Sequence, residues 1–250
     1  MGIEQGGISI TLPAFNEAEN IEALSEEIMG YCDARKIPYE IIIVNDGSAD
    51  ATGKIAEALA AKHKTVSVIH HSPNQGYGRS LLDGFKASRY EYLFFTDSDR
   101  QFKISSLDEL INHARDGSVD MVIGYRIDRQ DPFMRKFLSG CFNLLIRILF
   151  SLKVKDIDCA FKLFQKKAFE ALNIQSTDFL FNAELLTKAR IKNYSIREVG
   201  VRHYPRAGGT STVSPKHIVL TLKCLFALYR EVAAFKKMNR GVAGKQRFFG

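Results

Sequence analysis

The sequence EYLFFTDSDRQ at residues 91–101 joins an apolar run to a cluster of polar side chains. Its first part, Glu91–Thr96, has the aromatic and apolar composition of a buried β-strand. Asp97 and Asp99 follow, separated by one residue, and Gln101 stands two positions further on. A strand that ends in paired carboxylates is typical of a ligand site at the edge of an α/β sheet.

Similar apolar runs occur along most of the chain, and helical patterns lie between them. Strands that alternate with helices predict an α/β fold with a mostly parallel central sheet and helices on both faces. The predicted strands are Ile8–Leu12, Glu40–Val44, Val66–His70, Glu91–Thr96, Asp120–Gly124, Ala160–Phe164 and Ile196–Val201. The predicted helices lie near residues 17–35, 50–63, 78–89, 106–116 and 180–193. Two helix starts, Asn16 with Glu19 and Ser106 with Glu109, have the spacing of a capping box.

The pattern changes after residue 125. Pro132 precedes a long apolar helical stretch, Phe133–Leu152, which Arg135, Lys136 and Arg147 interrupt. A last helix is expected over about residues 216–237, followed by a basic tail. No segment is rich enough in Gly, Pro or Ser to separate two domains. We therefore expect one domain over residues 1–212, with residues 133–152 inside it, and a C-terminal helix and tail over residues 213–250.

Charge is distributed unevenly along the 250 residues, whose formal net charge is +7. Residues 1–125 hold 11 Lys and Arg against 19 Asp and Glu, a net of −8, whereas residues 126–250 hold 24 against 9, a net of +15. A composition of 46% hydrophobic and 25% charged residues excludes a disordered chain. The basic half predicts an anionic partner.

The cysteines and the apolar runs indicate in which cellular compartment the protein is expected. The four Cys are too scattered for a disulfide framework or a zinc site, so we expect buried thiols in a reducing compartment. The first residues do not resemble a signal peptide. No stretch reaches the roughly 18–20 apolar residues that a membrane-spanning helix needs.

Asp97 and Asp99 have two possible roles. Two carboxylates at positions i and i+2 after a buried strand can both reach one hard cation, and Mg²⁺ and Mn²⁺ commonly bridge such carboxylates to phosphates. Gln101 would add a neutral oxygen. Alternatively, the pair forms a turn before the helix near residue 106. Polar residues at the ends of neighbouring predicted strands favour the metal site.

Asp46 follows another predicted strand. Its carboxylate can accept hydrogen bonds from a ribose or base, and it can also form an Asx turn with Gly47 and Ser48; both can hold at once. The stretch 75–79 resembles a phosphate loop only partly, because Leu81 occupies the position of the third Gly in the dinucleotide fingerprint. The chain also contains no G-x-x-x-x-G-K-[ST] motif. A Rossmann dehydrogenase and a P-loop nucleotidase are thereby excluded.

Taken in order, these motifs resemble family 2 glycosyltransferases, which have the GT-A fold. The motifs are Pro13-Ala14-Phe15-Asn16-Glu17, Asn45-Asp46-Gly47-Ser48-Ala49-Asp50, Asn74-Gln75-Gly76 and Asp97-Ser98-Asp99-Arg100-Gln101. Later motifs are similar to those of the polyprenol-phosphate sugar synthases, the group that includes the dolichol-phosphate mannose synthases. These are Gly124-Tyr125-Arg126, Arg135-Lys136-Phe137-Leu138-Ser139 with Asn143, Asp156 before Phe161-Lys162, and His203-Tyr204-Pro205-Arg206 before Ser211. The resemblance covers roughly residues 8–212.

The resemblance implies a role for each matching position. The nucleotide of a sugar-nucleotide donor would be held by Pro13, Phe15, Glu17 and Asp46, with Ser98 as a further substrate-binding residue. A divalent cation, Mg²⁺ or Mn²⁺, would be held on the donor diphosphate by Asp97, Asp99 and Gln101. The phosphate of a lipid acceptor would be gripped by Arg126, Arg135 and Ser139. Arg206 would steady the departing diphosphate, since a guanidinium matches paired phosphate oxygens. The catalytic set is therefore expected to be Asp99, Arg126 and Arg206.

The implied activity is an inverting, metal-dependent transfer of one hexose from GDP-mannose or a UDP-sugar to polyprenyl or dolichyl phosphate. A lipid monophosphate is already an anionic nucleophile, so this reaction requires no strong general base. An alternative keeps the fold and donor but uses a hydroxyl acceptor on a glycan or protein, with Asp156 or Asp158 as the base. A third possibility is a non-catalytic, nucleotide-binding regulatory module.

The stretch Phe133–Leu152 is either a core helix or a helix that lies in a membrane interface, with basic residues at its ends. The family resemblance favours the interface, where the helix would receive the isoprenoid chain. C-terminal amphipathic helices are expected to dock on an anionic membrane surface, peripherally and on the cytoplasmic face. Several relatives carry membrane-spanning helices after the catalytic domain, so this chain would dock alone or through a separate membrane-anchoring subunit. Nucleic acid is therefore a less suitable partner for the basic half than a membrane surface or a lipid phosphate.

Overall fold

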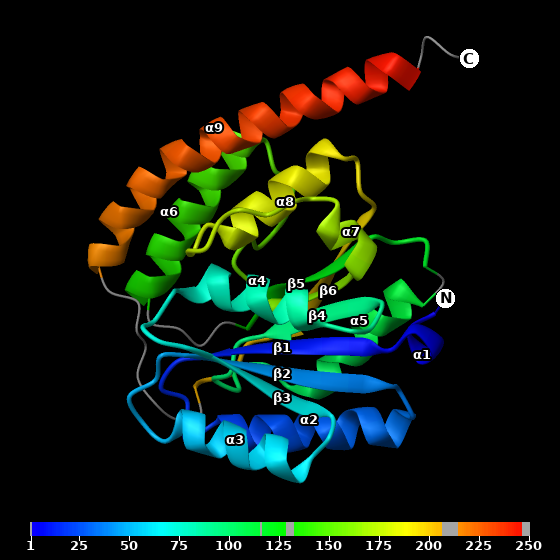
Figure 1. Ribbon diagram of the computed structural model, residues 1–250. Coiled ribbons are helices and arrows are strands. Elements are labelled where there is room, and N and C mark those ends of the chain that lie inside the picture. Colours follow the sequence, from blue (N-terminus) through cyan, green and yellow to red (C-terminus); the bar gives the residue numbers. More distant parts are fainter. Residues whose placement is uncertain (1, 116, 129–132, 207–214, 247–250) are drawn as a thin grey trace.

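The structure, a computed structural model, describes residues 2–115, 117–128, 133–206 and 215–246. Its core is a seven-stranded sheet with the order β3-β2-β1-β4-β6-β5-β7 (Figure 1). The strands are β1 Ile8–Ala14, β2 Tyr39–Asp46, β3 Val66–His71, β4 Tyr92–Thr96, β5 Met121–Ile127, β6 Phe161–Gln165 and β7 Ile196–Arg202. Every predicted strand is present. Among the described strands only β6 pairs antiparallel with its neighbours, which are β4 and β5, so the prediction of a mostly parallel sheet is confirmed.

Helices follow or precede most strands. They are α1 Ile3–Gly6, α2 Ile21–Arg35, α3 Thr52–Lys62, α4 Tyr77–Ala87, α5 Leu107–Ala114, α6 Phe133–Phe150, α7 Lys166–Glu170, α8 Phe181–Ile191 and α9 Pro215–Gln246, with a 3₁₀ turn at Ile104–Ser106. The short helices α1 and α7 have no counterpart in the sequence analysis, because four or five residues carry too little periodicity to detect. Helix α9 extends beyond the expected residues 216–237.

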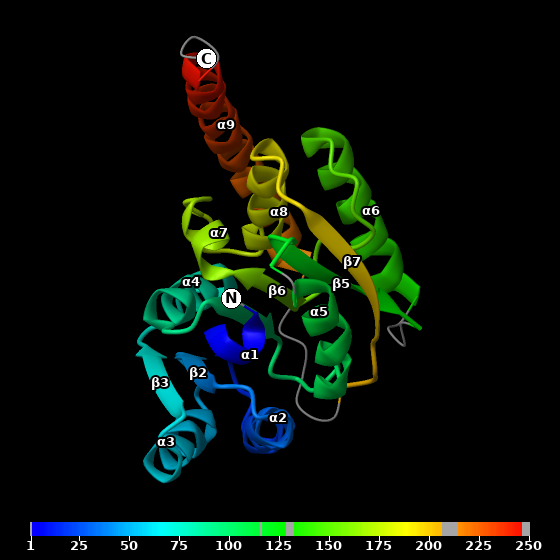
Figure 2. The same cartoon turned by 90° about the vertical axis from the view of Figure 1, so that its right-hand side faces the viewer.

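Two apolar cores lie on opposite faces of the sheet. Along β4, Tyr92 and Phe94 belong to the core beneath α2, α3 and α5, whereas Leu93 and Phe95 belong to the core beneath α4, α6, α8 and α9. This alternation follows from the two-residue period of a strand. Figures 1 and 2 show α2 and α3 on one side of the sheet and α4 and α8 on the other. Helices therefore cover both faces, as expected.

Neither predicted capping box forms. Asn16 precedes α2 by several residues, and its side-chain Oδ1 accepts a hydrogen bond from the Ala49 backbone N–H at 2.9 Å. Its own backbone N–H donates to Ser48 Oγ at 2.9 Å. Ser106 precedes α5 without a side-chain capping bond. Asn16 instead joins the segment after β1 to the segment after β2, a tertiary contact that competes with local capping.

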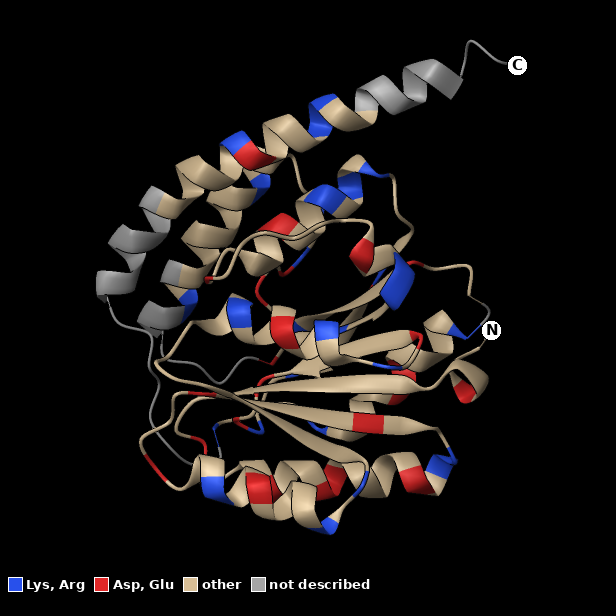
Figure 3. Cartoon of the chain, in the orientation of Figure 1, with Lys and Arg blue, Asp and Glu red and all other residues tan. Residues whose placement is uncertain are grey.

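Helices α6 and α9 expose most of the large apolar side chains that lie on the surface of the described residues. Eight of the nine are on these two helices, and Ile148 and Phe226 are 70% and 68% exposed. The helices meet where the Phe150 and Tyr229 rings lie 6.5 Å apart between centroids. Of the charged side chains described on α9, only Glu231 is acidic (Figure 3). We name this combined face the α6–α9 surface.

Two further expectations concern these helices. No helix among the described residues is both long and apolar enough to cross a membrane. Cys141 is exposed on α6, so the expectation of buried thiols is wrong at this position, although Cys32 and Cys159 are buried. The amphipathic character of the C-terminal helices and the division near residue 212 stay predictions.

Candidate active site

The carboxyl ends of β1, β2 and β4 lie together at one edge of the sheet. Ala14 pairs with Asn45 across β1 and β2, and Thr11 pairs with Phe95 across β1 and β4. Since these strands are parallel, the polar segments that follow them emerge at the same edge. The structure thus brings together the motifs that the sequence separates by dozens of residues.

Asp97 and Asp99 follow β4 directly. Asp97 is half-buried and Asp99 is 8% exposed. Burial raises the pKa of Asp97 to about 7, and the nearby Asp99 carboxylate acts in the same direction. The Tyr77 hydroxyl and the charges of Arg126 and Lys162 act to lower the pKa of Asp97 and oppose this effect. Two neighbouring carboxylates that disfavour each other's charge form a site that a cation would stabilise.

Arg206, which follows β7, reaches the same place from the far end of the chain. Its guanidinium forms an ion pair with Glu17, and its Nη1 lies 3.8 Å from Asp99 Oδ2. Glu17 is 8% exposed and also accepts a hydrogen bond from Asn20 Nδ2 at 2.8 Å. Burial raises the pKa of Glu17, although the charge of Arg206 acts against this shift. Arg206 therefore bridges the segments after β1 and β4.

Gln101 holds this bridging segment in place. Its side-chain Nε2 donates to the Tyr204 carbonyl oxygen at 3.0 Å, and its backbone N–H donates to Asp99 Oδ1 at 3.2 Å. The predicted role of Gln101 as a cation ligand stays a prediction. What its bonds achieve is to tie the segment that carries Arg206 to the segment that carries Asp99.

Ser98 joins the ends of β4 and β1. Its side chain is 2% exposed, and its hydroxyl donates to the Pro13 carbonyl oxygen at 2.8 Å. Pro13 and Phe15 are partly exposed just beyond this bond. The nucleotide contacts predicted for Pro13, Phe15 and Ser98 stay predictions. The Ser98 bond fixes the spacing between the two segments that would flank a donor.

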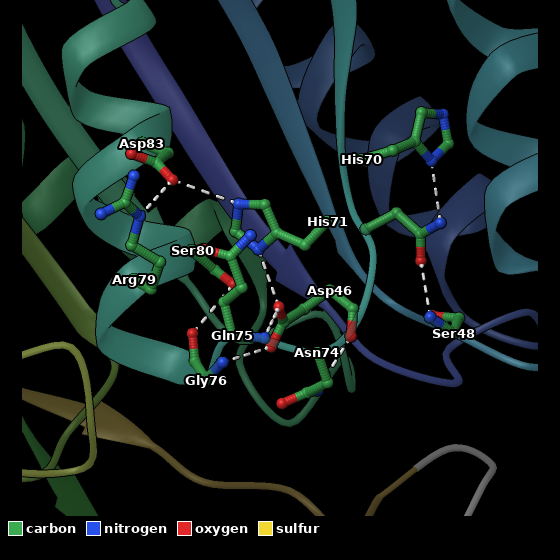
Figure 4. Close-up of polar contacts among 11 residues, drawn as sticks. Asp46, Ser48, His70, His71, Asn74, Gln75, Gly76, Arg79, Ser80 and Asp83 are labelled. Atoms are coloured by element: carbon green, nitrogen blue, oxygen red, sulfur yellow. Dashed lines mark hydrogen bonds and ion pairs between the residues drawn. The ribbon is translucent and has the colours of Figure 1, made fainter.

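Asp46 lies at the end of β2 and is 4% exposed. Its carboxylate accepts backbone hydrogen bonds from Gln75 at 2.8 Å and from Gly76 at 2.9 Å (Figure 4). His71 Nδ1 lies 2.7 Å from the same carboxylate. Gly47 turns with φ of 72°, and a Cβ there would lie only 2.7 Å from the Asn74 backbone nitrogen. Asp46 thus anchors residues 74–76, and a direct nucleotide contact stays a prediction.

The network extends from Asp46 through His71 into α4. His71 Nε2 lies 3.2 Å from Asp83 Oδ2, to which Arg79 Nε donates at 2.6 Å (Figure 4). On the other side of β3, His70 Nδ1 lies 2.9 Å from Asn45 Nδ2. These contacts attach α4 and β3 to the end of β2. They make the 74–79 segment a supported part of the site, although it lacks the sequence of a phosphate loop.

Arg126, at the carboxyl end of β5, is engaged by Asp156. Its Nε donates to Asp156 Oδ2 at 2.6 Å and its Nη2 donates to Oδ1 at 2.8 Å. This paired bond and the charge of Arg126 lower the pKa of Asp156, although burial acts to raise it. A paired grip on an acceptor phosphate would require Arg126 to share or open this ion pair. The sequence resemblance alone had not indicated such a partner.

Helix α6 adjoins Arg126 and Asp156. Asn143 on α6 accepts a hydrogen bond from the Ile157 backbone N–H at 2.8 Å and donates to Asp158 at 3.0 Å. Burial raises the pKa of Asp158. Ser139 lies one turn earlier on α6, where its carbonyl oxygen accepts a bond from Asn143 at 3.0 Å. The side chain of Arg135, and Ser211, lie outside the described residues, so their predicted contacts with phosphate stay predictions.

The residues present fit a divalent cation that takes part of its ligands from a substrate. The described residues contain no group of three or more His, Cys, Asp or Glu side chains arranged around one point. Asp97 and Asp99 would therefore provide two carboxylates, and diphosphate oxygens and water would complete the coordination. Mg²⁺ is commonly bound in this way, because it retains water and uses few protein ligands.

The sequence predicted no role for Tyr77, and Lys162 entered only as part of a family motif. Lys162 is fully buried on β6 and donates to the Ile157 carbonyl oxygen at 3.0 Å, while its charge also acts on Asp97. Burial lowers the pKa of this ammonium. A Lys inside an otherwise apolar strand is a signal that could have identified it. Tyr77 gave no such signal, because its residue type is common in both buried and exposed positions.

The chain matches the family described as Glycosyl transferase family 2 over residues 9–172, and it belongs to this family. Glycosyltransferase AglD of Haloferax volcanii is 30% identical over 211 residues, which cover 80% of the chain and 33% of AglD. Dolichyl-phosphate beta-glucosyltransferase ALG5C of Trichomonas vaginalis is 30% identical over 210 residues, which cover 77% of the chain and 62% of that protein. The chain thus spans a third of the first relative and about three fifths of the second.

Solved structures agree with the fold. Glucosyl-3-phosphoglycerate synthase from Mycobacterium tuberculosis, in complex with Mn²⁺, uridine diphosphate and glucosyl-3-phosphoglycerate, superimposes with a TM-score of 0.67. The match covers 93% of this chain and 81% of the other at 18% identity. At this level of identity the comparison supports the GT-A-like fold and no finer property. The expectation of a family 2 glycosyltransferase with a GT-A-type fold is confirmed.

Proposed function

We propose that the protein transfers one hexose from a sugar nucleotide to a polyprenyl or dolichyl phosphate, with inversion at the anomeric carbon. The observation that carries the proposal is the convergence of Glu17, Asp97, Asp99 and Arg206 at one sheet edge. Relatives named dolichyl-phosphate beta-glucosyltransferases support the class of acceptor. Their names also favour glucose as the hexose, and mannose from GDP is the competing donor to test.

The donor diphosphate would lie between Asp97 and Asp99 on one side and Arg206 on the other. A bound Mg²⁺ or Mn²⁺ would neutralise charge that develops on the departing nucleoside diphosphate. Arg206 would hold the same diphosphate as it leaves, because its guanidinium already lies beside Asp99. Pro13 and Phe15, both partly exposed, would flank the nucleoside. Asp46 would act by fixing residues 74–76 around the donor.

The acceptor phosphate would lie near Arg126 and the first half of α6. Ser139, Asn143 and Arg126 are connected here through Asp156 and Asp158. Because a phosphate monoester is already anionic at neutral pH, its oxygen can attack the anomeric carbon without losing a proton to the protein. The proposed reaction therefore needs no general base, whereas transfer to a hydroxyl needs a base that removes a proton.

The isoprenoid chain would extend over the α6–α9 surface. Ile148 and Phe226 are mostly exposed, and the α6 sequence contains basic but no acidic residues. Exposed apolar side chains flanked by basic groups suit the surface of an anionic bilayer. We therefore propose peripheral docking on the cytoplasmic leaflet, alone or with a membrane-anchoring subunit.

The proposal is tested by incubating purified protein with labelled UDP-glucose, GDP-mannose or UDP-N-acetylglucosamine, together with a polyprenyl phosphate and Mn²⁺. We expect one donor to give an organic-soluble product from which mild acid releases the labelled sugar. Asp99→Asn should give no product, and Asp108→Asn, on the surface pair with Arg35, should retain activity.

Three other results would contradict the proposal. Transfer to a glycan or protein, without an organic-soluble product, would support a hydroxyl acceptor with Asp158 as base, which the raised pKa of Asp158 would suit. Binding of sugar nucleotide without turnover on any acceptor would support a non-catalytic module. Unchanged cellular lipid-sugar pools after Asp99→Asn would support that module too.

A further inference from the structure

His71 is the last residue of β3, and it pairs in register with Asp46, the last residue of β2. Its side chain is only 4% exposed and lies between two carboxylates (Figure 4). Nδ1 is 2.7 Å from Asp46 Oδ1, and Nε2 is 3.2 Å from Asp83 Oδ2 on α4. None of the donor or acceptor contacts proposed above involves His71. The ring nevertheless joins three elements at the carboxyl edge of the sheet.

The two contacts of His71 define the charge of its ring. An ionised carboxylate only accepts hydrogen bonds, so a ring nitrogen bonds to it by donating a hydrogen. Nδ1 and Nε2 both face a carboxylate, and both can donate only in the imidazolium form. Asp46 faces the ring from β2 and Asp83 from α4; Arg79 donates to Asp83 at 2.6 Å, and Lys86 lies 4.0 Å from it. Positive and negative charges therefore alternate from the end of β2 to the surface of α4.

His70, the preceding residue, has the opposite arrangement. The Ser48 N–H donates to Asn45 Oδ1 at 3.2 Å, so the amide nitrogen of Asn45 faces His70 Nδ1, 2.9 Å away. That ring nitrogen must accept, and the hydrogen of the neutral ring is then on Nε2, 2.7 Å from the exposed Glu57. The geometry thus makes the ring neutral at position 70 and cationic at position 71.

The Asp46 carboxylate that His71 contacts also holds residues 74–76. Its Oδ1 accepts a bond from the Gln75 N–H at 2.8 Å, and its Oδ2 accepts one from the Gly76 N–H at 2.9 Å. Asn74 Nδ2 donates to the Asp46 carbonyl oxygen at 2.8 Å. A nearly buried carboxylate needs hydrogen bonds and a compensating charge. The His71 imidazolium supplies that charge directly to the group on which the segment is anchored.

His71 also restrains both ends of the 74–76 segment. It lies on the strand that leads into the segment, and Asp83 lies about two helical turns after Gly76 on the helix that follows. The contact between His71 and Asp83 ties that strand to that helix. Residues 74–76 therefore cannot shift along β2 without breaking contacts at both carboxylates.

We propose that His71 is a positioning residue whose imidazolium, bonded to Asp46 and Asp83, fixes residues 74–76 as a wall of the nucleotide subsite. This inference rests on the proposed function, which places a sugar nucleotide at this edge of the sheet. His71 makes no contact with the donor and transfers no proton. It acts by holding the segment, before binding, in the geometry that the nucleotide meets.

The charge of the ring is tested by NMR of the ring nitrogens in the histidine-labelled full chain near neutral pH. The signals are assigned by their loss in His71→Gln and in His70→Gln. We expect two protonated nitrogens for His71 and one, Nε2, for His70. A single protonated nitrogen on His71 would overturn the inference.

The positioning role is tested by calorimetric titration of the purified full chain with UDP and GDP in the presence of Mn²⁺. His71→Gln keeps a polar side chain and removes the charge. We expect its dissociation constant for the nucleotide to rise roughly tenfold, because hydrogen bonds to charged groups are stronger than neutral ones. In the transfer assay the KM for the donor should rise by a similar factor. The KM for polyprenyl phosphate should change by less than about twofold, since only the donor subsite is altered.

His70→Gln is the matched control, because it makes the same exchange on the same strand but starts from a neutral ring. It should bind nucleotide as the parent does. Asp83→Asn keeps His71 and removes the charge of its second partner, whose side chain is 17% exposed, and should weaken nucleotide binding by a smaller factor. Unchanged binding in a folded His71→Gln would overturn the inference. If that variant does not fold, unchanged binding in Asp83→Asn would do so.

Nucleotide binding by the parent separates this inference from the proposed function. If the parent binds UDP or GDP and His71→Gln binds it equally well, only the role of His71 is wrong. If the parent binds neither nucleotide, the donor assignment fails, and with it both proposals. Equal losses in His71→Gln and His70→Gln would indicate a general loss of stability and would contradict a specific positioning role.

Discussion

The carboxyl edge of the sheet and the α6–α9 surface are built in opposite ways. At the edge, charged side chains are nearly buried and bond to one another: Glu17 and Asp99 are each 8% exposed and both adjoin Arg206. On the surface, Ile148 and Phe226 are about 70% and 68% exposed. The edge is pre-organised, so its substitutions should alter chemistry. The exposed apolar side chains of the α6–α9 surface are stabilised only when another apolar phase covers them. Substitutions on this surface should therefore alter docking.

Of the substitutions Arg206→Ala, Ile148→Glu and Asp158→Asn, the first should have the largest effect. In Arg206→Ala, the donor diphosphate would lose a cation and the buried Glu17 would lose its partner. We expect kcat/KM to fall about 100-fold, as when one stabilising donor is removed from a developing anion. The free energy of unfolding should also fall by about 1–2 kcal/mol.

Steady-state transfer assays and thermal unfolding measure these two effects. Arg202→Ala is the matched control, because Arg202 is exposed and lies 3.6 Å from Asp128 at the surface. It should behave like the parent protein. Equal activity of the two variants would mean that the sheet edge does not act on the diphosphate through Arg206.

Ile148→Glu should weaken the docking of the α6–α9 surface on a membrane. It places a negative charge in the α6–α9 surface and removes an exposed apolar side chain. We expect partition onto vesicles of phosphatidylglycerol and phosphatidylcholine to fall about tenfold, since roughly 25 cal/mol of transfer free energy is lost for each Å² of apolar area left uncovered. Co-sedimentation measures this partition.

Transfer to a short-chain, water-soluble polyprenyl phosphate should be unchanged in the same variant. Ala61→Glu, an exposed position on α3, makes the same change of charge on the opposite side of the sheet and should partition like the parent. If both variants bind vesicles equally, the α6–α9 surface is not the docking face.

Asp158 lies beside helix α6, where Asn143 donates a hydrogen bond to it. Of the three substitutions, Asp158→Asn should have the smallest effect. Burial raises the pKa of this carboxyl above its ordinary value of 3.8, so the folded protein binds the proton more tightly than the unfolded chain. Stability from this group is complete below that ordinary value and is lost as the pH rises through the folded pKa. Asp158→Asn should therefore stabilise the fold at pH 8, by on the order of 1 kcal/mol, and give no gain at pH 3.

Unfolding in urea at several pH values measures this difference. The Asn side chain can still accept the bond from Asn143 Nδ2, which is 3.0 Å long in the parent. Transfer to a lipid phosphate should persist, because no base is needed. A large loss of transfer with an intact fold would instead indicate that Asp158 removes a proton from a hydroxyl acceptor.

Much of the fold follows from local patterns. Apolar runs such as Ile41–Val44 and Leu93–Phe95 are short and bounded by polar turns, so their identity as strands and their ends could be predicted. The position of Asp97 and Asp99 at the carboxyl edge of the sheet could also be predicted, because they follow a strand end directly. The capping boxes failed, since tertiary bonds from Asn16 to Ser48 and Ala49 replaced the local ones.

By itself the sequence determined the strands, most helices and the order of the family motifs, because hydrophobic period and motif spacing are properties of neighbouring residues. The antiparallel insertion of β6 between β4 and β5 was decided only by the tertiary structure. So were the meeting of Arg206 with Glu17, 189 residues apart, and the bond from Gln101 to the Tyr204 carbonyl oxygen, 103 residues away. Such contacts depend on how strands pair and helices pack, and no local pattern specifies which distant side chains then converge.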